Sequence, residues 1–419
     1  MRERDRKPRA IQALIDAFSL PDLRQKLIFT FAMLVVFRFI AHVPVPGVIP
    51  SALSEIFSSN PLLGMLDLFS GGAMRNFSVA AMGVYPYITA SIVMTLLVPV
   101  IPKLQALSQE GESGRQKVNQ ITHWLTIPLA ALQGYAQLAL IRSQGAFGPV
   151  PLTPLETVSI IATMTAGTMF LVWLGELITE RGIGNGVSII IVGGIVAGFP
   201  ALLQSGFIAQ QTNVGGLAVF VVLSVLIIAL IVIFTEAHRR IPVQYARSQM
   251  RGTKMYRQSG STHIPLRVNM AGMIPLIFAM SVMLFPGQIA SFFMGPASSP
   301  NFANTVYNLF DTTHVLYWVL YFVLVLAFTF FYTLIIFQQQ DMAKVLQQQG
   351  GFVPGIRPGE PTRNYLNGVV TRITTGGALF LALVAVMPYI SEKLTNVQAL
   401  QLSSTGLLIM VGVALDTMK

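Results

Sequence analysis

The chain has 419 residues, of which 53% are hydrophobic and 11% charged, with a formal net charge of +10 and a mean hydropathy of +0.65. A typical soluble domain is about 25% charged, so the composition excludes an ordinary soluble fold and predicts a polytopic membrane protein. The absence of cysteine excludes disulfides, thiolate metal sites and cysteine nucleophiles.

The N-terminal segment 1–26 is basic and amphipathic, without an apolar core region or a small-residue cleavage site. It is therefore expected to be a cytoplasmic segment rather than a signal peptide. Ten apolar segments follow, near 27–43, 77–101, 121–141, 158–177, 183–203, 215–235, 268–292, 315–337, 369–390 and 402–415. They predict an all-α membrane protein of ten transmembrane helices, with a first half at 27–204 and a second half at 205–419.

The distribution of basic residues supports this count. If the ten spans alternate from a cytoplasmic N-terminus, all of the 27 lysines and arginines lie on the cytoplasmic side except Arg38, Arg75, Arg142 and Lys393. Cytoplasmic loops of membrane proteins are enriched in lysine and arginine. The sequence therefore predicts both the number of spans and their orientation.

Residues 61–101 contain a short apolar stretch, a glycine break and a long charge-free stretch. The first stretch, 62–69, is too short to cross a bilayer, and Ser70-Gly71-Gly72 interrupts it and is expected to be flexible. The second stretch, 77–101, is long enough to cross. Irregular backbone at membrane depth persists only where protein or water surrounds it, so a central cavity holding a movable segment is predicted.

A short internal repeat links the second and seventh apolar segments. Residues 83–94 read GVYPYITASIVM and residues 272–283 read GMIPLIFAMSVM. Six of the twelve positions are identical, namely Gly83/Gly272, Pro86/Pro275, Ile88/Ile277, Ala90/Ala279, Val93/Val282 and Met94/Met283. A duplicated unit of five spans must insert in opposite orientations, which predicts an inverted repeat; chance similarity between two apolar helices is the alternative. Both prolines are expected to kink their helices.

The sequence offers no catalytic site. The five histidines are scattered, with no metal-ligand spacing. The glycine-rich run at 181–186 lacks the lysine of a phosphate loop and predicts a tight turn into the next span. Gly194 and Gly198 have the small-xxx-small spacing of helix packing.

Six aliphatic residues are candidates for a constriction in the cavity. They are Val84, Ile88, Val187, Ile191, Ile277 and Ile409. Val84/Ile88 and Val187/Ile191 each have i,i+4 spacing, so each pair occupies one helix face. An apolar constriction can gate by dewetting and bind no particular solute. Ordinary core or lipid-facing positions explain the same periodicity equally well.

Two long polar loops, 236–267 and 338–368, are predicted to face the cytoplasm. The first carries a cluster of arginines that includes Arg239 and Arg240, and the second places Arg357 in a turn-rich stretch. The positive-inside bias explains much of this charge, but it does not explain the length of the loops. A docking surface for a large acidic or ribonucleoprotein partner is the sharper interpretation.

Two other functional classes remain open at this point. An ion-coupled solute carrier normally places ionisable residues at the bilayer midplane, and the predicted spans have none there. A membrane scaffold without transport activity would not need a glycine-broken half-helix.

Several motifs together resemble the SecY family, the channel subunits of the bacterial protein translocon. They are LFSGGAMRNFS (68–78), EGESGRQKVNQ (110–120), ERGIGNGVSIII (180–191), HIPLRVNMAGMIP (263–275) and GFVPGIRPGEPT (351–362). The resemblance extends from Leu20 to the last residue and includes loops, so it is more specific than hydropathy.

The resemblance implies a protein-conducting channel without cofactor in the bacterial plasma membrane, built from two inverted halves of five spans around a central pore. Such a channel translocates unfolded preproteins and releases transmembrane segments into the lipid through a lateral gate of the second, third, seventh and eighth spans. The implied partners are SecE, SecG, the motor ATPase SecA, the ribosome and signal-sequence-bearing polypeptides.

The resemblance also implies roles for individual residues. The six aliphatic residues above would form the pore ring, and Arg239, Arg240 and Arg357 would meet the motor or the ribosome. The plug, within 62–75, would include Leu62, Leu63, Gly64, Met65, Leu66, Asp67, Leu68, Phe69, Ser70, Gly71 and Gly72.

Overall fold

The computed structural model describes residues 20–49, 53, 67, 70–143, 146–147, 153–209, 214–251, 254–293, 301–310, 314–340, 342–395, 406, 409–415 and 417. The chain forms two compact units. Unit 1 comprises Met1–Ser91, Thr122–Leu203 and Asp416–Lys419, and unit 2 comprises Ile92–Ile121 and Gln204–Leu415.

The described part of the chain is mostly helical. The helices are α2 (Pro21–Ile40), α5 (Tyr85–Leu97), α6 (Pro102–Gln109), α7 (Glu112–Ser143), α8 (Pro154–Arg181), α9 (Gly186–Ala209), α10 (Val214–Glu236), α11 (Ile274–Phe292), α12 (Phe302–Leu309), α13 (Val315–Gln340), α14 (Met342–Gln348) and α15 (Glu360–Thr395). Nine of the predicted apolar segments coincide with a helix. The tenth is described only at residue 406 and over 409–415, where it is helical.

Hydropathy and length identify four helical stretches among the described residues that could cross a membrane: Glu112–Arg142, Pro154–Arg181, Val315–Gln348 and Glu360–Ile390. Helices α5 and α6 become a fifth if they count as one span, since they meet at a bend of 103°. In α2, the side chains of Phe31, Val35 and Phe39 are exposed and share one face. Exposed aromatic and aliphatic side chains at helical spacing suit contact with lipid.

Unit 1 contains α2 and α8, which pack against each other. The first turn of α8 is stabilised by a capping box, in which Thr153 and Glu156 satisfy each other's backbone N–H groups. The helix ends at Arg181, and residues 182–185 form the predicted tight turn into α9.

The repeat at 83–94 and 272–283 has the same local structure in both copies. Gly83 has φ +57° and Gly272 has φ +63°, and Pro86 and Pro275 are each the second residue of a helix. The predicted kinks at these prolines are therefore wrong, because a proline in the first turn lacks only an N–H that has no helical acceptor. Prolines do lie inside other helices, among them Pro128 on α7, Pro286 on α11 and Pro388 on α15.

The predicted span 77–101 is also shorter than expected. Helix α5 covers only Tyr85–Leu97, and residues 71–84 form a series of turns with one isolated bridge between Ser78 and Pro44. Hydropathy alone does not distinguish an apolar turn from an apolar helix.

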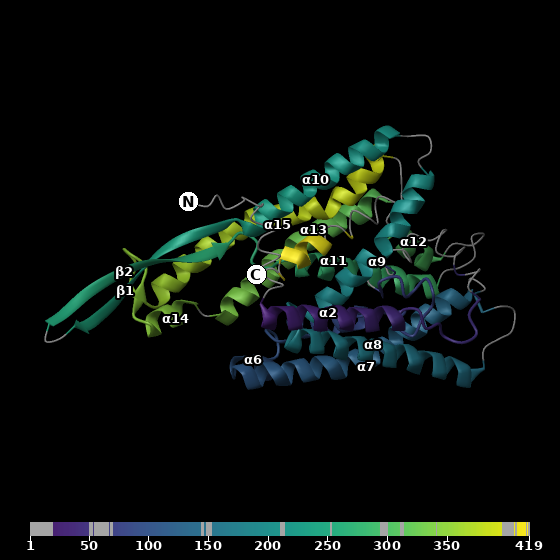
Figure 1. Cartoon of the computed structure of the whole chain (residues 1–419), viewed down its shortest axis with the longest axis horizontal. Coiled ribbons are helices and arrows are strands. Elements are labelled where there is room, and N and C mark those ends of the chain that lie inside the picture. The colour runs from purple at the N-terminus through teal and green to yellow at the C-terminus, as the bar shows by residue number, and fades with distance from the viewer. Residues whose placement is uncertain are drawn as a thin grey trace, which may run out of the picture. The chain divides into compact units, whose positions relative to one another are not determined.

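Unit 2 contains a three-stranded sheet that the all-α prediction lacks. Strands β1 (His238–Arg251) and β2 (Lys254–Arg267) form one long antiparallel hairpin (Figure 1). The short strand β3 (Gly351–Phe352) pairs with β1 at Gln244 and Tyr245, so the strand order is β2-β1-β3. The two loops predicted as separate polar segments therefore belong to one folded part of the chain.

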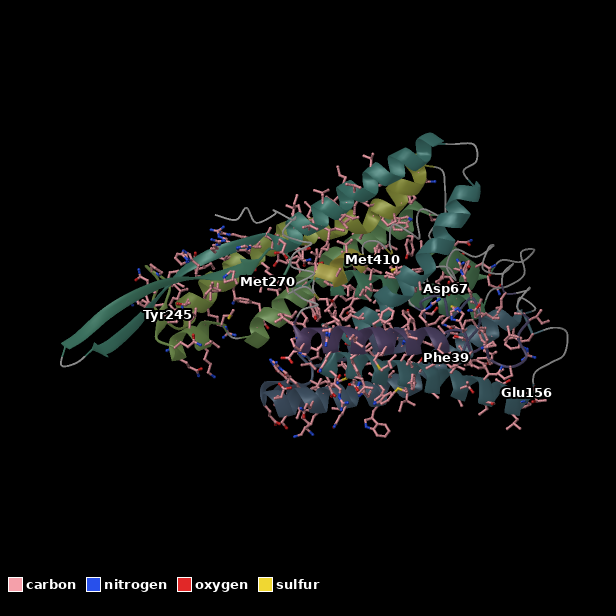
Figure 2. The ribbon with its side chains drawn as sticks, viewed as in Figure 1. Phe39, Asp67, Glu156, Tyr245, Met270 and Met410 are labelled. Atoms are coloured by element: carbon pink, nitrogen blue, oxygen red, sulfur yellow. The ribbon has the colours of Figure 1, made fainter. Side chains whose placement is uncertain are left out.

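We call this part the sheet module: β1, β2, β3, α14 and the adjacent ends of α13 and α15. Its hydrophobic core consists of Ile241, Val243, Leu266, Phe337, Ala343, Leu346, Val353, Leu366, Val369 and Val370. Tyr245 and Met270, both labelled in Figure 2, pack against this core. Side chains alternate between the two faces of a strand, which explains why Ile241 and Val243 are buried while Arg240 and Pro242 are exposed.

Candidate channel residues

The predicted ring residues of unit 1 lie on α9 and around the start of α5. Val84, Ile88 and Ile191 are buried, with 0%, 6% and 2% of their surface exposed. Val187, in the first turn of α9, is partly buried and lies against Gly175 of α8. Three of the four side chains in unit 1 are thus buried in the chain, and Val187 is partly buried.

The two remaining ring residues belong to unit 2. Ile277, in the first turns of α11, and Ile409, in the C-terminal helical segment, are both buried. Gly412, one turn after Ile409, packs closely against Met273 just before α11. The C-terminal segment and α11 are therefore neighbours in unit 2, as a shared constriction requires. Closure of the complete ring stays a prediction, because its members divide between the two units.

Only part of the predicted plug lies within the described residues. Asp67, Ser70, Gly71 and Gly72 are described, whereas 62–66 and 68–69 lie outside. The glycine pair does form a turn, with φ +67° at Gly71 and +82° at Gly72. Positive φ values strain any residue with a side chain, so the sequence signal for a break here was correct.

The structure adds a network of polar contacts around this turn. Asp67 is buried, and its carboxylate lies 2.9 Å from Nε of Arg75. The guanidinium of Arg38, near the C-terminal end of α2, donates a hydrogen bond of 2.6 Å to the carbonyl of Gly71. The sequence placed Arg75 within the predicted plug, 62–75, but indicated no contact for it and no role for Arg38. The sequence carried little signal for the contact of Arg38, because an arginine near the end of an apolar span usually extends toward the membrane interface.

Gly194 has a packing role, as its spacing predicted, although it packs against a turn and not against a helix. A Cβ atom at Gly194 would overlap the Cα atom of Gly71. Gly198, one helical turn further along α9, has no atom of the described chain within 4 Å of the corresponding position. A side chain is therefore excluded at Gly194 by its contact with Gly71, but no described neighbour excludes one at Gly198.

The three predicted docking arginines all belong to the sheet module or its connections. Arg239 and Arg240 are exposed on β1, and Arg357 is exposed in the turn between β3 and α15. The carbonyl of Arg357 accepts a hydrogen bond of 2.8 Å from Thr362 of α15, which holds the turn against the helix. Pairing of β1 with β3 brings the two loops together on one scaffold.

Within the described residues, no group of three or more histidine, aspartate and glutamate side chains could hold a metal ion.

Comparison with known proteins identifies the family. The SecY family model matches residues 78–418. The chain is 42% identical to the protein translocase subunit SecY of Streptomyces scabiei, covering 98% of this chain and 96% of the relative. It is 44% identical to the protein translocase subunit SecY of Halalkalibacterium halodurans, covering 97% and 96%.

Solved structures agree on the fold. A structure described as a protein conducting channel has a TM-score of 0.63 at 17% identity, covering 94% of this chain and 91% of the other. Sec61 in the canine ribosome-channel complex has a TM-score of 0.61 at 16% identity, with the same coverage. The chain therefore belongs to the SecY family, the protein-conducting channels of the Sec translocon.

Proposed function

We propose that the chain lets unfolded preproteins cross the bacterial plasma membrane through an aliphatic constriction and releases transmembrane segments sideways into the lipid. One observation carries this proposal: the candidate ring residues Val84, Ile88, Ile191, Ile277 and Ile409 are buried inside protein, although aliphatic side chains at these positions could have faced lipid. An apolar constriction excludes ions by dewetting. It also suits a substrate whose side chains vary at every position.

The plug and the gate complete the proposed mechanism. The plug, 62–75, moves aside when the chain enters, and the ring closes around the translocating polypeptide. Helices α5, α7, α11 and α13 line the lateral gate. Apolar segments leave through it because lipid solvates them better, by about 0.3–0.6 kcal/mol for each Leu, Ile, Phe or Val at a helix centre.

The sheet module is the proposed docking site for the motor SecA or the ribosome, and SecE and SecG are the proposed companion subunits. The exposed Arg239, Arg240 and Arg357 supply positive charge suited to an acidic or ribonucleoprotein surface. This assignment requires the module to face the cytoplasm, with the N-terminus on the same side. The positive-inside rule supports that orientation.

The ring is tested by resting ion conductance of the complete translocon reconstituted in planar bilayers. Ile88→Ser and Ile277→Ser should each raise the conductance several-fold, because a hydroxyl group favours wetting of the constriction. Val282→Ser is the matched control for Ile277→Ser, since Val282 lies on the same helix but is 37% exposed. Equal conductance of the Ile277→Ser and Val282→Ser channels would refute the ring.

The docking assignment is tested by preprotein export into membrane vesicles. Arg357→Glu should reduce export several-fold while the channel still inserts into the membrane, because reversing the charge repels an acidic partner. Lys344→Glu on α14 changes the charge of the same module equally and is exposed. Export at the normal rate with Arg357→Glu, or an equal loss with Lys344→Glu, would contradict a specific role for Arg357.

A further inference from the structure

The described residues 67 and 70–75 contact one another around the buried carboxylate of Asp67. Only 7% of Asp67 is exposed. One carboxylate oxygen accepts hydrogen bonds from Ser70 Oγ at 3.3 Å and from the backbone N–H of Arg75 at 3.1 Å, and the other lies 2.9 Å from Arg75 Nε. A buried carboxylate requires such partners. Because these partners lie within 70–75, Asp67 and residues 70–75 form one locally bonded unit.

Backbone contacts strengthen the same unit. The N–H of Gly72 donates to the carbonyl of Asp67 at 3.0 Å, and the N–H of Met74 donates to Ser70 Oγ at 3.0 Å. Ser70 Oγ in turn donates to the carbonyl of Asp67 at 3.0 Å. Movement of this segment therefore requires release of its contacts with neighbouring helices rather than bending within it.

One such contact is the charged hydrogen bond from Arg38 to Gly71, at 2.6 Å. Arg38 is itself tied to the chain beyond α2, since its carbonyl lies 2.7 Å from Nδ1 of His42. Hydrogen bonds with one ionised partner are roughly twice as strong as neutral ones. Figure 2 labels Phe39, the neighbour of Arg38, and Asp67.

The second contact is a direct approach of two backbones. A Cβ atom at Gly71 would lie 2.6 Å from the Cα atom of Gly194 and 2.8 Å from the ring of Phe37. A Cβ atom at Gly194 would overlap the backbone of Gly71. Neither position can hold a side chain while the two segments stay in contact.

We infer that Arg38 and Gly194 are positioning residues that hold the end of the plug against the first half of the channel. We call the arrangement of Arg38, Gly194, Gly71 and Phe37 the Gly71 clamp. The Ser70-Gly71-Gly72 turn is then a fixed anchor that holds the resting channel shut, in contrast to the flexible hinge that its glycines predict from sequence. The sealing role of the clamp rests on the proposed function, whereas the contacts of Gly71 with Arg38 and Gly194 are seen in the structure.

Hydrogen exchange on the complete translocon in lipid nanodiscs tests the clamp. Gly194→Ala should make the amides of 71–78 exchange at least about tenfold faster, a change of about 1.4 kcal/mol in the local opening free energy. Gly198→Ala is the matched control, because it adds the same methyl group to the same helix at a position where no described atom outside that helix lies within 4 Å. Equal exchange in the two variants would overturn the inference.

A second pair of variants keeps the test decisive if Gly194→Ala fails to fold. Arg38→Met removes the donor at similar length and should also speed exchange of 71–78, whereas Arg38→Lys retains a cationic donor and should restore part of the protection. Wild-type exchange with Arg38→Met would contradict the clamp.

Resting conductance then separates the clamp from the channel proposal. Faster exchange with higher conductance in Gly194→Ala supports the inference. Faster exchange at unchanged conductance would overturn it, because the segment would be held but would not seal the pore. The Ile88→Ser and Ile277→Ser channels test the ring without altering the clamp, so the two proposals can fail independently.

Discussion

The sheet module is held together by side chains, whereas the Gly71 clamp depends on positions that have none. In the module, Ile241, Val243 and Leu346 share a hydrophobic core with residues from α13 and α15. In the clamp, Gly71 and Gly194 bring two backbones into contact, and a single charged hydrogen bond from Arg38 secures them. The two regions should therefore respond to opposite kinds of substitution.

The physical reason is that repulsion between overlapping atoms rises much more steeply with decreasing distance than attraction between atoms in contact falls with increasing distance. Dispersion and hydrophobic contacts decline gradually as atoms are removed. An added atom where two backbones touch forces them apart, because close-packed interiors have little free volume. Removal of a side chain should damage the module, and addition of one should damage the clamp.

The largest effect is expected from truncation in the module. Leu346→Ala should lower the local free energy of unfolding by about 2–5 kcal/mol, since Leu346 is 4% exposed and contributes to the core. Hydrogen exchange of β1 and β2 measures this loss. The neighbouring Val345 is 39% exposed, so Val345→Ala should change stability by less than about 0.5 kcal/mol. Similar losses in both variants would mean that the module has no real core.

A smaller effect is expected where a glycine is needed for its backbone conformation. Gly83→Ala and Gly272→Ala should each cost about 1–2 kcal/mol, because both glycines have positive φ values just before α5 and α11. Exchange of the first turn of each helix provides the measurement. Comparable losses at the two sites would support a true repeat, and a loss at only one would favour chance similarity.

The smallest effect is expected at the ion pair within the plug segment. Asp67→Asn removes the charge but retains oxygen as an acceptor for Ser70 and for the N–H of Arg75. Arg75 has a half-exposed side chain, and partly exposed ion pairs contribute about 1 kcal/mol or less. Exchange of 71–78 should therefore increase less than in Gly194→Ala. A larger increase would make the ion pair, rather than the backbone contact, the main support of the segment.

Local signals predicted several features correctly. Apolar segments marked nine of the helices, and the glycine break at 70–72 is a turn. The same signals failed where tertiary contacts intervene. The alternation of Ile241, Val243 and Tyr245 has the period of a strand, yet the arginines around it led to its interpretation as a polar loop. The prolines at 86 and 275 begin helices instead of kinking them, because the preceding glycines allow the chain to turn first.

The sequence by itself determined the membrane class, the positions of most helices and the family, because composition, hydropathy and motifs are properties of consecutive residues. Only the tertiary structure decided that β3 pairs with β1, that Arg38 holds Gly71 and that Gly194 must lack a side chain. Each of these contacts joins residues distant in the chain. Such a pairing depends on which surfaces meet after the helices pack, and no local pattern specifies it.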